Sequence, residues 1–165
     1  MATLTNLESK LAEVLGLAMA AQDLAQDIRK MLGPEHRPLD QRLAKARDEA
    51  RETQKRCTAL AATFKGKKTA ILEAARETKK EAAEMQEAYL GGEDDPLDGF
   101  EFLTMAEAGE VGHWSIVAKF NEKAGNAQLR ELTDWALPIQ QRHLQEALDG
   151  SLKLVGEEDP NAEAE

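Results

Sequence analysis

The sequence predicts an all-α protein, and three observations lead to that fold class. Strong helix formers (Ala, Leu, Glu, Lys, Arg and Gln) dominate the 165 residues. Apolar residues recur at steps of three and four, which is the period of a helix face that packs on other helices. Glycine and proline gather in short clusters between these stretches. We therefore expect one helical domain over residues 1–154, followed by an acidic, disordered tail over residues 155–165.

The first two helices are expected over residues 4–32 and from residue 38 onward. The first apolar stripe alternates steps of four and three and consists of Leu7, Leu11, Val14, Ala18, Ala21, Ala25, Ile28 and Leu32. Gly33 and Pro34 end this helix. A second stripe runs from Leu39 to Phe64 with the same steps. The connector is short, so we expect the two helices to be antiparallel neighbours.

The stretch Lys65-Gly66-Lys67-Lys68 leaves two alternatives for residues 38–90. The apolar phase continues from Phe64 to Ile71, which would allow one long helix and an elongated scaffold. We favour a break at Gly66, because glycine in a helix interior costs about 1 kcal/mol. The residues up to Leu90 then form a separate connecting helix.

The last two helices should follow the loop at residues 91–96. Asp98 or a near neighbour is expected to cap the first of them, and Gly125-Asn126 should close it. Its predicted core face is Phe102, Met105, Ala106, Gly109, His113, Ile116, Val117 and Phe120. The final helix should run from Ala127 to Leu154, with a kink just before Pro138.

Two histidines on these helices form the candidate site. His113 follows Glu110 by three residues, and His143 follows Gln140 by three. On helical wheels all four fall on or beside the apolar stripes, so we expect them to converge between the two helices. Glu107 falls on the outward side of the same wheel. Paired positions of this kind are how helical bundles build metal sites in their cores.

Two interpretations of Glu110, His113, Gln140 and His143 stay open. They could bind iron or manganese, because neutral imidazole and carboxylate suit both metals. The alternative, which we favour, is a buried polar network that binds no metal and fixes the helix register. A dinuclear centre normally takes more carboxylates than these positions supply.

The order of elements also carries a resemblance. It rests on the stretches Lys10-Leu11, Ala70-Ile71-Leu72, His113-Trp114-Ser115-Ile116 and Leu137-Pro138-Ile139-Gln140-Gln141. Their order is similar to the ferritin-like family of small bacterial stress-induced proteins of the YciE/YciF type. The resemblance implies an up-and-down four-helix bundle with an extra crossover helix, often dimeric, with a di-metal site.

The chain departs from that family's pattern at several expected ligands. Gly112 and Ser115 stand where the family has glutamates around the histidine, Gln140-Gln141 replaces an acidic pair, and Gln22 replaces a glutamate. The resemblance therefore implies a degenerate di-metal site.

Composition narrows the function classes further. The net charge of −10 argues against nucleic acid as a partner. No apolar run approaches the length of a membrane span and no signal peptide is evident, so we expect a cytoplasmic protein. Cys57 is the only cysteine, and we expect it to be buried and inert.

The function expected from these observations is non-enzymatic. We expect a ferritin-like protein that acts through its helical surface, as a homodimer or with a protein partner, in a stress response. The alternatives are a metal-binding protein in iron handling or oxidative stress, and the elongated helical scaffold.

Overall fold

The computed structural model describes residues 2–163, and these form an all-helical structure. The elements in chain order are α1 (Asn6–Met31), a 3₁₀ turn (Pro34–His36), α2 (Arg37–Ala61), α3 (Lys68–Leu90), α4 (Pro96–Ala124) and α5 (Ala127–Val155). The predicted fold class is thus confirmed at the level of an all-α protein. None of the described helices is both long and apolar enough to cross a membrane.

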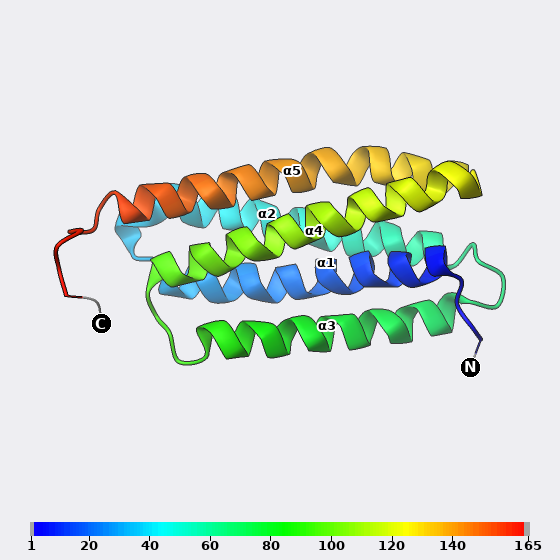
Figure 1. The fold of residues 1–165 in the computed structure, drawn as a ribbon, viewed down its shortest axis with the longest axis horizontal. Coiled ribbons are helices and arrows are strands. Elements are labelled where there is room, and N and C mark those ends of the chain that lie inside the picture. The colour runs from blue at the N-terminus through cyan, green and yellow to red at the C-terminus, as the bar shows by residue number, and fades with distance from the viewer. Residues whose placement is uncertain (1, 164–165) are drawn as a thin grey trace.

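The helices lie side by side, and each runs opposite to the one before it (Figure 1). α1 packs against α2, α3 and α4, while α5 packs against α4 and α2. α3 has its main contacts with α1 and only small ones with α2 and α4. The arrangement places α1, α2, α4 and α5 around a shared interior, with α3 attached outside α1.

Local signals in the sequence set the helix ends. Thr5 caps α1 in a reciprocal capping box with Glu8, in which each side chain accepts the other residue's backbone N–H. Asp95 rather than Asp98 caps α4, since its side chain accepts the N–H of Leu97. Gly125 ends α4 at a φ of 68°, a conformation that glycine adopts without strain.

The predicted break near Gly66 is confirmed. α2 ends at Ala61, α3 begins at Lys68, and Gly66 in the connecting turn has a φ of 72°. That left-handed backbone cannot continue a helix. The long helix that an elongated scaffold needs is therefore not formed.

The last helix continues through Pro138, so the predicted kink position does not interrupt α5. Beyond Val155 the described residues form turns. In one of these turns, the Oε2 of Glu157 lies 2.9 Å from the Nε2 of His36, a buried residue just before α2. The order or disorder of the acidic tail as a whole stays a prediction.

Two apolar clusters fill the interior, one towards each end. The first contains Leu11, Leu15, Cys57, Ile71 and Trp114, all fully buried. The second consists of Leu24, Ala25, Ile28, Leu39, Leu43, Leu90, Phe100, Phe102, Leu103, Ala147 and Leu154. Along α4 and α5, polar residues occupy the stretch between the two clusters.

The buried face of α4 is shifted by one residue along the helix relative to the predicted face. The expected burial of Phe102 and Val117 is confirmed. At the other positions the buried residues are Leu103, Glu110, Trp114 and Asn121, each one residue after an expected one, and Gly109, His113 and Phe120 are not buried. One residue is a rotation of about 100°. The rotation brings Trp114, the largest fully buried side chain, into the core. It leaves Met105, Ile116 and Phe120 exposed by 51%, 42% and 37%.

Candidate functional site

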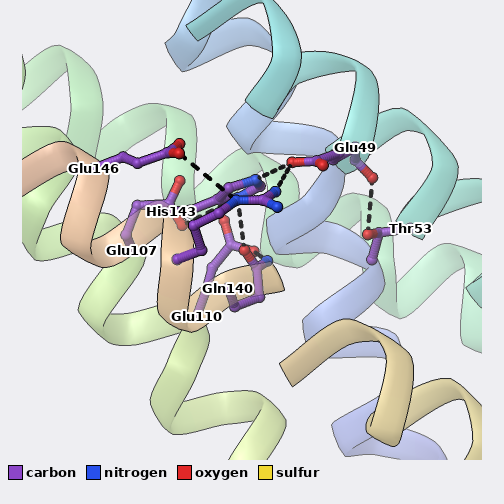
Figure 2. Close-up of polar contacts among 8 residues, drawn as sticks. Glu49, Thr53, Glu107, Glu110, Gln140, His143 and Glu146 are labelled. Atoms are coloured by element: carbon purple, nitrogen blue, oxygen red, sulfur yellow. Dashed lines mark hydrogen bonds and ion pairs between the residues drawn. The ribbon is translucent and has the colours of Figure 1, made fainter. Parts of the chain in front are cut away.

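A layer of polar side chains separates the two apolar clusters. It consists of Glu49 of α2, Glu107 and Glu110 of α4, and Gln140 and His143 of α5, and we call it the polar layer (Figure 2). Glu107, Glu110, Gln140 and His143 are each 3–5% exposed. Charged groups at such depth are costly unless they are paired or neutralised.

Hydrogen bonds join four of these residues in a continuous chain. The Gln140 amide nitrogen donates to Glu110 Oε2. The Gln140 Oε1 lies 3.0 Å from His143 Nδ1, and the other ring nitrogen, Nε2, lies 2.7 Å from Glu49 Oε2. Arg142 also donates to Glu49 from the outer side. Both nitrogens of His143 are therefore engaged by protein groups.

The orientation of the Gln140 amide is coupled to where the protons lie. With its nitrogen towards an ionised Glu110, its oxygen accepts from a protonated Nδ1 of His143. Turned by half a rotation, the amide accepts from a protonated Glu110 and donates to an unprotonated Nδ1. Hydrogen positions follow from such networks rather than from atomic positions alone.

Burial decides which arrangement is favoured. It raises the pKa of Glu110 to about 7, against the effect of the bond from Gln140. It lowers the pKa of His143, against the effect of Glu49. Burial also acts to raise the pKa of Glu49, but the bonds from His143 and Arg142 together hold it below its ordinary value. Burial thus shifts Glu110 and His143 towards their neutral forms.

Glu107 has a buried carboxylate oxygen without a hydrogen-bond partner. This oxygen, Oε2, lies 3.8 Å from His143 Nδ1. Burial, and then the charge of Glu110, raise its pKa well above the ordinary value. The wheel placed Glu107 on the outward side, and this expectation is wrong because of the one-residue rotation of α4.

The expected convergence of four residues is correct for Glu110, Gln140 and His143 but wrong for His113. The His113 side chain is 37% exposed, and its Nδ1 lies 3.0 Å from Glu13 Oε2 on α1. The rotation that buries Trp114 turns His113 away from α5. Gln22 is also outside the layer, since its amide donates to Gln54 of α2.

His143 lies among more carboxyl groups than the single Glu110 that the sequence predicts beside it. Glu49 and Glu107 join Glu110 around it, and Glu146 lies close by (Figure 2). Even so, no group of three or more His, Cys, Asp or Glu side chains within residues 2–163 is placed to hold a metal ion. The proposed ligand set does not fit a metal in this arrangement, because His143 has no free nitrogen and His113 faces elsewhere.

His113 instead borders a cavity of about 250 Å³, which we call the α1/α3/α4 pocket. Its walls are mostly apolar, and Glu107 and Glu110 also line it. The polar layer therefore faces α5 on one side and this pocket on the other.

No protein family, curated protein or solved structure matches this chain.

Proposed function

We propose that this chain is a non-enzymatic helical-bundle protein that acts through its surface as a homodimer. The fold we propose for it is the ferritin-like one, with α3 as the crossover helix. The alternating helix directions and the attachment of α3 outside α1 support that assignment.

The observation that carries the proposal is the exposed apolar stripe of α4. Met105, Ile116 and Phe120 lie on one helical face and keep 37–51% of their surface exposed. Gly109 and Gly112 lie between them, and a side chain added at either meets nothing within 4 Å. An apolar stripe with small residues at its middle suits the close approach of a second helix. The α4 stripe of a second copy is the simplest such partner.

The polar layer supports the non-enzymatic part of the proposal. The hydrogen bonds of Glu110, Gln140 and His143 are made to one another and to Glu49, so the network serves chiefly to hold α2, α4 and α5 in register.

Sedimentation equilibrium tests the dimer. The wild-type chain should sediment as a dimer, and Ile116→Glu should make it a monomer without loss of helicity, because the charge would be buried in the interface. Leu152→Glu, at an apolar residue of α5 that is 60% exposed, is the matched control and should leave the dimer intact. A monomeric wild type, or equal effects of the two variants, would contradict the proposal.

One observation favours metal binding as a second candidate. Three carboxylates, Glu49, Glu107 and Glu110, approach His143 or its hydrogen-bond partner, which is more acid than the sequence suggested. Metal analysis by mass spectrometry after anaerobic loading with ferrous iron decides between the candidates. We expect substoichiometric iron. About two irons per chain with oxygen consumption would establish the second candidate and end the first.

A further inference from the structure

The α1/α3/α4 pocket has the shape of a small-ligand site. Its volume of about 250 Å³ lies between helices that contact each other little, α3 and α4, with α1 beside both. Ala20, Ala21, Ala82 and Gly109 leave the space open. Cavities of roughly 150 Å³ already admit a benzene ring, so one ring with a short substituent fits here.

The rim and walls of the pocket are apolar and aromatic. Met85, Tyr89 and Met105 line it and keep 51–60% of their surface exposed. Tyr89 lies against Phe102, with ring centroids 5.5 Å apart. Aromatic faces and thioether groups attract both apolar bodies and cations.

Carboxyl groups predominate among the ionisable side chains of the pocket. Of the described residues that line it, Glu107 and Glu110 are acidic and His113 is the only basic group, with no lysine or arginine among them. Glu107 Oε2 is buried and accepts no hydrogen bond. That oxygen lies 3.8 Å from His143 Nδ1, and Glu107 as a whole residue lines the pocket.

We propose that the α1/α3/α4 pocket binds a lipophilic ammonium ion, a primary amine whose apolar body lies among Met85, Tyr89 and Phe102 and whose nitrogen donates to Glu107 and Glu110. The apolar walls remove the body from water, and the two carboxyl groups take up the three N–H donors. An anionic ligand of the same shape would face two carboxyl groups with no lysine or arginine to pair with. The inference goes beyond the proposed function and rests on the pocket alone.

Three probes of matched shape test the charge preference. Isothermal titration calorimetry would compare 2-phenylethylamine, 2-phenylethanol and 3-phenylpropanoate at pH 7.5. The amine should bind about tenfold or more tightly than the alcohol, because a hydrogen bond to a charged group adds that much discrimination. The carboxylate should bind most weakly. Equal binding of amine and alcohol, tightest binding of the carboxylate, or binding of none would overturn the inference.

Two variants locate the site. Gly109→Leu should abolish binding by filling the pocket, and its Cβ meets nothing within 4 Å. Gly112→Leu, three residues further along α4 with equally open space and outside the pocket lining, should bind the amine like the wild type. Glu107→Gln should reduce the preference for amine over alcohol while leaving the alcohol's affinity unchanged. Binding that survives Gly109→Leu, or a preference that survives Glu107→Gln, would contradict the assignment.

Because Met105 and Gly109 belong to both the pocket lining and the α4 stripe, the titration is repeated on Ile116→Glu. Amine binding by the monomeric variant supports the pocket whatever the fate of the dimer. Loss of binding there, with helicity intact, would count against a site built by one chain.

Discussion

The amide of Gln140 joins the side chains of Glu110 and His143. Burial disfavours the charged form of both. Glu110 and His143 lie on opposite sides of Gln140, and each can be neutral only if the amide faces it in the matching orientation. An amide serves this place well because it donates and accepts on its two ends, whereas a glutamate there would only accept when ionised.

Gln140→Leu should destabilise the protein by about 2–4 kcal/mol, since it leaves the buried Glu110 carboxyl and the Nδ1 of His143 without their partner. Urea unfolding followed by circular dichroism measures the change. Gln145→Leu, at an exposed glutamine of the same helix, is the control and should change stability by less than about 0.5 kcal/mol. Equal effects of the two substitutions would show that the network contributes nothing.

The raised pKa of Glu110 predicts how stability depends on pH. Between its ordinary value of 4.5 and its folded value of about 7, the folded state keeps a proton that the unfolded state has released. Stability therefore falls as pH rises through this window, by an amount on the order of 3 kcal/mol. Glu110→Gln should remove this fall, so that the variant matches the wild type near pH 5 and exceeds it at pH 8.

Urea midpoints measured from pH 5 to pH 8 check the difference between wild type and Glu110→Gln. The raised pKa of Glu107 acts in the same direction as that of Glu110, and the lowered pKa of His143 acts in the opposite one. The contribution of His143 is present in both proteins and largely cancels in the difference. The contribution of Glu107 is smaller in the variant, which lacks the charge of Glu110, and this further reduces the fall of its stability with pH. Glu101→Gln, at an exposed acid of α4, should run parallel to the wild type. A variant that is less stable than the wild type at pH 8 would disprove the burial argument.

At the scale of the helix, the ends of α4 could be predicted from the sequence, but its buried face could not. Glycine, proline and capping residues mark the ends of the helices, so the number, order and approximate ends of the helices could be predicted. The rotation of α4 could not, because Met105, Ile116 and Phe120 form an apolar stripe as good as the buried one. Tertiary packing determines which face of α4 is buried. It places Trp114 in the core and Glu107 and Glu110 beside α5.

That packing explains which site residues were found. Gln140 and His143 lie on α5, whose buried face agrees with the prediction at Leu129, Leu132 and Ala136. His113 and Glu107 lie on α4 and were both misplaced. The only signal that could have placed them is the spacing of Leu103, Glu110, Trp114 and Val117, and it contains a charged residue that hydrophobic patterns count against.

The contact between α4 and α5 depends on the absence of a side chain at position 150. A Cβ at Gly150 would overlap the ring of Phe100, which is 2% exposed. Gly150→Ala should therefore destabilise the fold by about 1–3 kcal/mol despite alanine's better helix propensity. Thermal unfolding measures the shift, and a stabilising Gly150→Ala would contradict the close approach.

At the scale of the whole molecule, Cys57 reports on opening of the interior. The thiol is fully buried in the first apolar cluster, and burial, with the charge of Glu110, raises its pKa to about 12. A disulfide reagent such as Ellman's reagent needs the exposed thiolate, so labelling of the native protein should require opening of the α1–α2 interface. The control is a double variant, Cys57→Ala with Ala108→Cys, whose single thiol lies on the surface of α4. Labelling of Cys57 in the wild type as fast as labelling of this control would contradict the expectation.

The same thiol tests whether the two apolar clusters unfold as one unit across the polar layer. Gly150 and Phe100 belong to the end that contains the second cluster, whereas Cys57 belongs to the first. Because Glu49, Glu110, Gln140 and His143 bond α2, α4 and α5 together between the clusters, we expect one cooperative transition. Gly150→Ala should then speed labelling of Cys57 by the factor that its equilibrium destabilisation implies, about tenfold for each 1.4 kcal/mol. A Cys57 labelling rate unchanged by Gly150→Ala would mean that the ends open separately and that the polar layer divides the core rather than joining it.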